Sequence, residues 1–397
     1  MLRLLIAAGL AVLLPALAAP SAQAGKRMEV ALQDDGVFLY EEHYDRDLAY
    51  RQLRALGATH LRMNILWWQP IPAAQRTQTT VPSNITYNWA VWDNAIDRAA
   101  DFGIKVQLDL AGDPPAWACG NLRPPYACDG YKPNRALFAH FVGAAVSHFK
   151  GRVSRYSLWN EPNWYTWISP HKRSPILYRK LYQAGYNAAK AVDPNAEVVM
   201  GELAPHFQKN ISMPPLEFVR KMVCVNERLK RTKGANRKCG RKPLKFDAFS
   251  IHPYDLTTRP TKLREDPDEV TMANINELPK LLDRLRRKGL VDPIKRKFPV
   301  YVTEYGYFVA GRRAVPEKTR KRWIVQAWQL AQKSPRVKQM LHYVFVSPPV
   351  DSPSSYFDMG LLTSSGTFRP SYGALQNWIQ GALAAGKLAR PGPCSAC

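Results

Sequence analysis

The chain has 397 residues and a formal charge of +24, because 56 Lys and Arg residues oppose 32 Asp and Glu residues. A chain of this length forms one large domain or two, and no segment repeats at the period of a solenoid, which excludes repeat architectures. The strong positive charge favours anionic partners. A nucleic-acid binder rests on charge alone, since no base-reading helix or stacking sheet is recognisable. We therefore expect no nucleic-acid binding and favour anionic polymers of the cell envelope.

The first 24 residues have the pattern of a secretory signal peptide. Arg3 supplies the positive start, residues 4–14 form an apolar core too short to span a bilayer, and Ala22-Gln23-Ala24 is a cleavage site. A retained anchor is the alternative. No later run approaches about 18 apolar residues, so we expect no membrane span in the mature chain and a secreted or envelope-associated protein.

Six cysteines fit an exported protein, in which disulfides are stable. The sequence does not fix their connectivity, but proximity favours Cys119 with Cys128, Cys224 with Cys239, and Cys394 with Cys397. A zinc site is the alternative; no Cys or His pair has a second pair to complete one, so we expect no metal and no cofactor. The last pair lies in a Pro/Gly/Cys tail, residues 386–397, as a terminal staple or a loose end.

Between residues 25 and 385, strand-like and helix-like segments alternate strictly. The pattern predicts strands at 28–32, 58–65, 104–110, 153–159, 196–201, 246–251, 300–303 and 337–346. It predicts helices at 46–56, 89–101, 135–149, 175–192, 215–225, 274–288, 316–333 and 371–384. This alternation indicates an α/β fold, a single (β/α)₈ TIM barrel with its active site at the carboxyl ends of the strands. A doubly wound sheet is the alternative, but no glycine fingerprint follows the first strand.

Two predicted strands end on a glutamate. Glu161 follows the fourth strand and precedes Pro162, which cannot continue a central strand. Glu304 follows the seventh strand and precedes a loop-forming Gly306. The two glutamates are 143 residues apart, or three βα units, so they should face each other across the barrel mouth. Two such carboxylates suit glycoside hydrolysis, in which one protonates the leaving oxygen and the other attacks or activates water.

Asn160-Glu161-Pro162 on the fourth strand, with Glu304 on the seventh, resembles the clan A glycoside hydrolases, which are retaining enzymes on (β/α)₈ barrels. The longer form, Trp159 to Asn163, is most similar to family 39, whose members include xylosidases, iduronidases and exopolysaccharide hydrolases. The resemblance implies that Glu161 is the acid/base and Glu304 the nucleophile. The same split follows from chemistry, because the acid needs a pKa raised by burial and by its partner's charge.

The resemblance also assigns the neighbouring residues. Arg62 would hold the nucleophile, and Asn160 would bind the sugar 2-hydroxyl. Tyr254 would donate a hydrogen bond to Glu304, and His252 would lie near the acid or the sugar. A rim ion pair for Arg62 and a satisfied rim histidine are the structural alternatives.

Aromatic residues cluster in the loops after the second, third and fourth strands: Trp67, Trp68, Trp117, Trp164, Tyr165 and Trp167. Flat rings suit sugar faces, and we expect Trp117 and Trp164 to contact substrate, although loop packing explains some of the six. Many clan members end the eighth strand with a tryptophan under the scissile sugar. This chain has His342, Tyr343 and Phe345 there, which leaves the sugar specificity open.

We therefore predict a secreted retaining glycosidase that hydrolyses O-glycosidic bonds of a polysaccharide or glycoconjugate with two glutamates. The alternative is a non-catalytic carbohydrate-binding or envelope-associated barrel. Two basic segments lie before the sixth and seventh strands and should merge on the face opposite the active site. Their residues are Arg228, Lys230, Arg231, Lys233, Arg237, Lys238, Arg241, Lys242 and Lys245, and Arg284, Arg286, Arg287, Lys288, Lys295, Arg296 and Lys297. Such a basal patch would bind anionic envelope polymers, or merely aid solubility.

Overall fold

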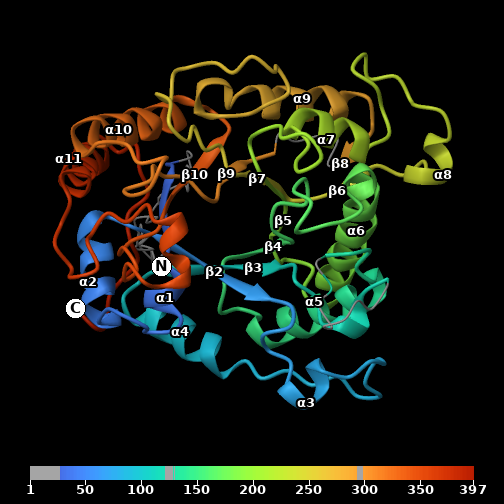
Figure 1. Ribbon diagram of the computed structural model, residues 1–397, viewed down its shortest axis with the longest axis horizontal. Coiled ribbons are helices and arrows are strands. Elements are labelled where there is room, and N and C mark those ends of the chain that lie inside the picture. The colour runs from blue at the N-terminus through green and yellow to red at the C-terminus, as the bar shows by residue number, and fades with distance from the viewer. Residues whose placement is uncertain (1–26, 121–127, 129, 293–297) are drawn as a thin grey trace, which may run out of the picture.

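The computed structural model describes residues 27–120, 128, 130–292 and 298–397. Parallel strands form a closed barrel in the order β1-β10-β9-β7-β5-β4-β3-β2, and helices surround it (Figure 1). The barrel strands are β1 (Glu29–Gln33), β2 (His60–Leu66), β3 (Lys105–Ala111), β4 (Arg155–Leu158), β5 (Val198–Leu203), β7 (Ala248–Ile251), β9 (Val300–Val302) and β10 (Val337–Tyr343). The (β/α)₈ prediction is confirmed, with each predicted strand present to within a few residues.

Long helices connect successive barrel strands and pack on their outer faces (Figure 1). They are α2 (Arg46–Leu56), α4 (Ala90–Asp101), α5 (Arg135–Phe149), α6 (Ser174–Val192), α7 (Pro215–Met222), α9 (Glu277–Arg287), α10 (Glu317–Lys333) and α11 (Pro370–Ala384). Shorter ones are α1 (Asp35–Phe38), α3 (Ala73–Arg76) and α8 (Ala235–Cys239), with 3₁₀ turns η1 (Ala116–Ala118), η2 (His171–Arg173), η3 (Met272–Asn274) and η4 (Pro353–Phe357). Across the described ranges, no helix combines the length and apolar character needed to cross a membrane.

Helix α2 shows how local sequence sets the boundaries. The Asp45 side chain accepts a hydrogen bond from the Leu48 amide at 2.6 Å and so caps the first turn. Gly57 ends the helix with φ +102°, a left-handed conformation that glycine adopts without strain. Tyr50 and Leu53 are fully buried on the side that faces the barrel. The predicted start and end of this helix are therefore confirmed.

The base of the barrel interior is filled by paired polar side chains. Arg155 donates to both carboxylate oxygens of Glu29, at 2.8 and 2.9 Å, and its guanidinium lies 4.1 Å from the centre of the Tyr301 ring. Gln339 donates to Gln107 at 2.8 Å across the interior. These side chains fill the lower end of the barrel interior, which leaves the carboxyl ends of the strands as the face for a site.

Three cysteine pairs lie at disulfide distance, as predicted: Cys119–Cys128, Cys224–Cys239 and Cys394–Cys397, with Cα separations of 5.8, 6.2 and 5.7 Å. The tail that carries the last pair is not a loose end. The Ala389 amide donates to the Met28 carbonyl at 3.0 Å, and Arg54 donates to the Gly392 carbonyl at 2.8 Å. The tail therefore packs across the base of the barrel.

One feature of the base was not predicted. Strands β6 (Leu244–Lys245) and β8 (Val291–Asp292) pair in parallel and form a small sheet below β7 and β9. The pairing joins the segments that precede these two barrel strands, because Leu244 lies opposite Val291 and Lys245 opposite Asp292. The two basic segments are thereby brought together, apart from Lys295, Arg296 and Lys297, which lie outside the described residues.

Candidate active site

The turn after β4 places the first glutamate. Trp159 has φ +79° and Glu161 φ +34°, so the chain leaves the strand through conformations that are unfavourable for these residues. Surrounding contacts hold them: the Glu161 amide donates to the Glu202 carbonyl at 3.0 Å, and the Trp159 indole donates to the Trp167 carbonyl at 3.2 Å. The buried Asn163 side chain donates to the Ala204 and Met213 carbonyls at 2.8 Å each. The turn is therefore fixed by tertiary contacts.

Glu161, His252 and Glu304 meet at the mouth. One oxygen of each glutamate and one ring nitrogen of the histidine all lie within 4.8 Å of one another. Nδ1 of His252 is 3.0 Å from Oε1 of Glu161 and 3.5 Å from Oε2 of Glu304. The Tyr254 hydroxyl donates to Glu304 at 3.0 Å. The structure thus brings together four residues that the sequence proposed from separate strand ends.

Arg62 stands beneath the two glutamates and is fully buried. It donates to Glu304 and to Asn160, at 3.0 and 3.2 Å. Further bonds reach Gln33 and, at 2.8 Å, Asp109. These contacts hold the Glu304 carboxylate beside a permanent positive charge.

Glu202 at the end of β5 was missed from the sequence. It is fully buried, lies 2.8 Å from Nε2 of His252 and 3.5 Å from Arg62, and accepts a hydrogen bond from Thr303. Burial alone would raise its pKa, but the charges of Arg62 and His252 lower it to about 2. Its sequence signal was a glutamate directly after the predicted strand at 196–201, the position that Glu304 has after the strand at 300–303.

The charge of His252 follows from these neighbours. Burial alone would lower its pKa, but the charge of Glu304 and the hydrogen bonds to Glu161 and Glu202 raise it to about 10. At neutral pH the ring is therefore an imidazolium, which donates from Nε2 to Glu202 and from Nδ1 to Glu161. In this protonation state both ring nitrogens of His252 donate, so the ring offers no lone pair to a cation between Glu161 and Glu304.

The net pKa shifts of Asp109 and Glu161 are upward, opposite to that of Glu202. Burial and the negative charge of Glu202 raise the pKa of Asp109 to about 8, and the positive charge of Arg62 opposes this shift. Burial also raises the pKa of Glu161; the hydrogen bond with His252 opposes this shift, and the charge of Glu304 adds to it. The cluster thus holds one carboxyl group inclined to keep its proton at the place where a leaving oxygen would need one.

A cavity of about 700 Å³ opens above this cluster. The described residues that line it are Asn64, Asn160, Glu161, Trp164, Trp167, Ala204, Pro205, His206, Phe207, Gln208, Ser212, Tyr254, Leu256, Arg264, Glu269, Glu304, Arg313, Tyr343, Tyr356 and Phe357. Its size and aromatic content suit a few sugar units. Tyr343 at the end of β10 also lines it, and the centre of its ring lies 5.6 Å from that of Phe357.

The predicted aromatic residues divide between cleft and core. Trp164 and Trp167 line the cavity. Trp117 is not among the lining residues: it is 6% exposed, and its indole donates to the Gln75 carbonyl at 2.9 Å. Trp67 is fully buried and stacks on Phe141 at 5.8 Å. Trp117 therefore packs in a loop, and Trp67 packs in the core.

No protein-family model matches the sequence, and no curated protein does. Solved structures do match. A family 39 glycoside hydrolase from the gut symbiont Bacteroides cellulosilyticus WH2 superposes with a TM-score of 0.62 at 18% identity, covering 89% of this chain and 64% of that one. The chain has a fold similar to family 39.

Two further structures widen the comparison. A monomeric β-xylosidase from Caulobacter crescentus CB15 gives a TM-score of 0.57 at 18% identity over 88% of this chain and 67% of that one. Xylanase 10B from Thermotoga petrophila RKU-1, in complex with xylobiose, gives a TM-score of 0.53 at 15% identity, over 90% of this chain and 95% of that one. The chain thus spans about two thirds of the length of the first two structures and nearly all of the xylanase. The predicted resemblance to clan A is confirmed at the level of the fold.

Proposed function

We propose that this protein is a retaining glycosidase that cleaves O-glycosidic bonds of a polysaccharide or glycoconjugate. The observation that carries the proposal is the approach of Glu161 and Glu304, whose oxygens lie within 4.8 Å of each other at the mouth of the barrel. Retaining enzymes hold their two carboxyl groups roughly 5–5.5 Å apart, whereas inverting enzymes leave room for a water molecule.

In the first step Glu304 attacks the anomeric carbon, and the bond from that carbon to the leaving oxygen breaks as Glu161 gives the oxygen its proton. The product is a glycosyl ester of Glu304. In the second step Glu161, now ionised, takes a proton from water, and the water oxygen displaces Glu304 from the anomeric carbon. Two displacements at one carbon return the original configuration.

The surroundings favour this exchange of roles. The charge of Glu304 is one reason why the pKa of Glu161 is raised before the first step. Esterification of Glu304 removes that charge, while the imidazolium of His252 stays 3.0 Å from Glu161. The pKa of Glu161 therefore falls when the residue must act as a base.

Asn160 and Tyr254 would contact the sugar. Because Arg62 donates to Oδ1 of Asn160 at 3.2 Å, the amide is held with its NH₂ group free to donate to a hydroxyl. Tyr254 orients Glu304 through its hydroxyl at 3.0 Å. Hydrogen bonds to the 2-hydroxyl strengthen in the transition state, so this fixed amide adds to the rate rather than only to binding.

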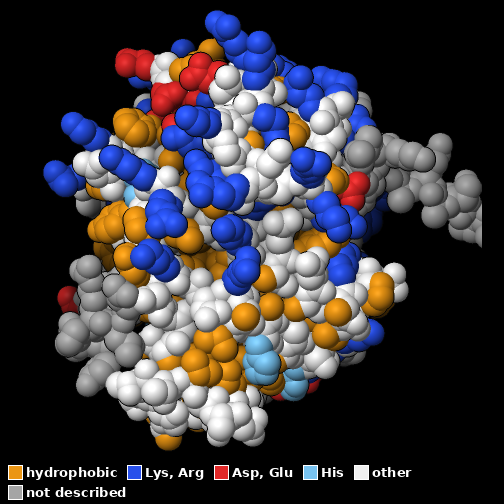
Figure 2. Space-filling view, turned by 90° about the vertical axis from the view of Figure 1, so that its right-hand side faces the viewer, with side chains coloured by type: hydrophobic (Ala, Val, Ile, Leu, Met, Phe, Trp, Pro, Cys, Tyr) orange, Lys and Arg blue, Asp and Glu red, His pale blue; other side chains and the backbone are white. Residues whose placement is uncertain are grey.

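We further propose that the protein is exported and that the basal patch binds anionic envelope polymers. The three disulfides suit an oxidising compartment. From residue 221 to 245 the chain has ten Lys and Arg residues and one acidic residue, Glu227. Most of these basic side chains are exposed, and Lys and Arg crowd the face formed by α6 and α8 (Figure 2). This density of one charge favours a polyanion.

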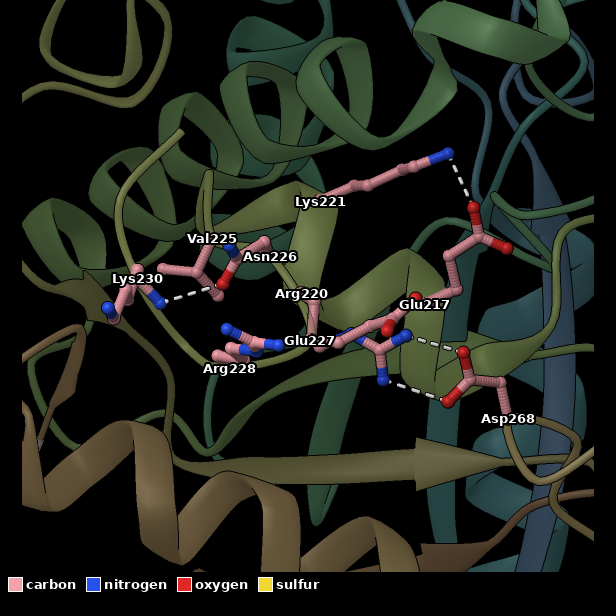
Figure 3. A pocket seen from close by; sticks show the side chains of 9 residues that line it. All are labelled: Glu217, Arg220, Lys221, Val225, Asn226, Glu227, Arg228, Lys230 and Asp268. Carbon is pink, nitrogen blue, oxygen red and sulfur yellow. Dashed lines mark hydrogen bonds and ion pairs between the residues drawn. The ribbon is translucent and has the colours of Figure 1, made fainter. Parts of the chain in front are cut away.

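A hollow of about 590 Å³ lies at the edge of the patch (Figure 3). It gives weaker support to the binding of a polyanion. Arg220 donates to both oxygens of Asp268, at 2.8 and 2.5 Å, and Lys221 pairs with Glu217 at 2.5 Å, so these two cations are already neutralised. Arg228 and Lys230 also line the hollow and are exposed. The unneutralised charge of the hollow therefore lies on the side formed by the loop after α7.

The test of the glycosidase compares Glu161→Gln with Glu269→Gln, a cleft carboxylate that bonds His206 at 3.1 Å instead of the central cluster. On an aryl glycoside with a poor leaving group, Glu161→Gln should lower kcat/KM about 10²–10⁴-fold, whereas a good leaving group should lose much less. Glu269→Gln should stay within about threefold. NMR of the first-formed product should show retained configuration. Inverted product, or sugar binding without turnover, would rule out the proposal and favour the non-catalytic barrel.

A further inference from the structure

Charge in the cleft is unevenly balanced. Among the described residues that line it, the cations are Arg264 and Arg313. Arg264 lies 3.9 Å from Glu269 and 3.3 Å from the Asp255 carbonyl, so its charge is met from within the protein. Arg313 is exposed and has no ion pair with any acidic side chain in the described part of the chain. A substrate entering the cleft therefore meets one cation whose charge is not already neutralised.

Arg313 is also held in place. Its guanidinium lies 4.2 Å from the centre of the Phe308 ring. The Phe308 ring packs edge-on against that of Phe357, with 5.1 Å between the ring centres. The centres of the Phe357 and Tyr254 rings are 5.7 Å apart, and Tyr254 donates a hydrogen bond to Glu304. An aromatic wall thus runs from the guanidinium to the residue that binds the proposed nucleophile. Because a cation over a ring gives up only part of its bonding capacity, the N–H groups remain available.

The loop that carries Arg313 is built as a turn. The Val309 amide donates to the Asp358 carbonyl at 3.1 Å, the Val315 amide to the Phe308 carbonyl at 3.0 Å, and the Ala314 amide to the Gly311 carbonyl at 3.0 Å. Gly311 has φ +75°, which the turn requires. A loop anchored by its own backbone loses little entropy when its arginine binds a ligand.

We propose that Arg313 binds an acidic group on the glycan, so that the substrate is an anionic polysaccharide with carboxylate or sulfate substituents. This inference rests on the proposed glycosidase function. A planar guanidinium pairs with the two oxygens of a carboxylate or sulfate, whereas a neutral glycan offers it only hydroxyl groups. The net charge of +24 would draw the same polymer to the protein from a distance. Trp164 and Trp167, which line the same cavity, supply ring surfaces for the sugar faces.

The experiment measures selectivity. Glucuronoxylan and alginate are each paired with their carboxyl-reduced forms, and a sulfated galactan is paired with its desulfated form. For wild type, Arg313→Gln and Arg312→Gln, one records kcat/KM on each member of a pair. Arg312 is an exposed cation on the same loop that does not line the cavity, so it controls for net charge.

In at least one pair, Arg313→Gln should reduce the preference for the charged member by about three- to tenfold, mainly through KM, as expected for a partly exposed ion pair. Arg312→Gln should change it less than twofold. A change in the carboxylated pairs would identify the bound group as a carboxylate, and a change in the sulfated pair would identify it as a sulfate. An equal loss on charged and neutral members, or the same change in both variants, would overturn the inference.

A second measurement separates this inference from the proposed function. Binding of the same charged glycans is measured in the Glu304→Gln background, with and without Arg313→Gln. Arg313-dependent binding without hydrolysis by the wild type would support the anionic site and refute the glycosidase. Hydrolysis that needs Glu161 but proceeds equally well on the charged and neutral members of each pair, with and without Arg313→Gln, would support the glycosidase and refute the anionic site. No binding of any charged glycan would also overturn the inference.

Discussion

Replacing Glu202 with Gln tests the electrostatics of the whole site with one isosteric change. Glu202 touches neither proposed catalytic glutamate with its side chain, but it lies 2.8 Å from Nε2 of His252, whose Nδ1 lies 3.0 Å from Glu161. The amide of Gln keeps an oxygen for the N–H of His252 and removes one negative charge. Arg62 stays positive, and the charge of Glu304 and the hydrogen bond to Glu161 still favour the protonated form of His252.

The size of the effect follows from the distances. Across the imidazole ring the carboxylates of Glu202 and Glu161 are roughly 8 Å apart, where a unit charge at an effective dielectric constant of about 20 is worth about 2 kcal/mol, or about 1.5 pKa units. Asp109 offsets part of this. The repulsion of Glu202 contributes to its pKa of about 8, so without Glu202 it ionises more readily beside Arg62. We therefore expect a net shift of about one unit.

Removing a negative charge makes the Glu161 carboxyl group easier to ionise, so the alkaline limb of the pH profile of kcat/KM, which reports the proton of Glu161, should move about one unit towards acid. The assay is hydrolysis of an aryl glycoside between about pH 3 and about pH 10, with Glu269→Gln as the matched cleft carboxylate. That control should move this limb by no more than about 0.2 units. An alkaline limb that stays in place, or moves towards alkali in a folded Glu202→Gln protein, would refute this account of the cluster.

Three further expectations concern stability and binding. Changing Cys224 and Cys239 to Ser should lower the free energy of unfolding by about 3 kcal/mol in urea titrations, because the bridge spans 15 residues; a loss under about 1 kcal/mol would contradict it. The folded pKa of His252, about 10, lies above the ordinary value of 6.5, so its contribution to stability is complete below pH 6.5 and is lost as the pH rises towards 10. Thermal unfolding between these limits should therefore depend less on pH in His252→Gln than in the wild type. Changing Arg237, Lys238, Arg241, Lys242 and Lys245 to Gln should weaken salt-sensitive binding to polyanionic envelope polymers but leave aryl-glycoside turnover unchanged within about twofold. A parallel fall in both would show that the basal patch belongs to the active site.

The sequence alone determined the barrel and the ends of two of its strands. Alternating periodicity, with a capping Asp45 and a terminating Gly57, marks a helix through local backbone chemistry, which operates in any context. Glu161 and Glu304 were found in the same way, since each follows a short apolar run and precedes a residue that ends a strand. The cysteine pairs could also be predicted from the sequence, because a short loop is the least costly to close. All three pairs are close in the chain.

Only the tertiary structure decided which polar residues act together. Glu202 follows a predicted strand as Glu304 does, but nothing in this local pattern shows which residues it pairs with. Its ionisation depends on Arg62, 140 residues away, and on His252, 50 residues away. Trp117 is the opposite case, a residue expected in the cleft that packs elsewhere. In the sequence, an aromatic residue of a loop has the same pattern whether it faces a sugar or donates to a carbonyl. Charge state and exposure depend on distances that folding creates between remote residues, so no pattern along the chain contains them.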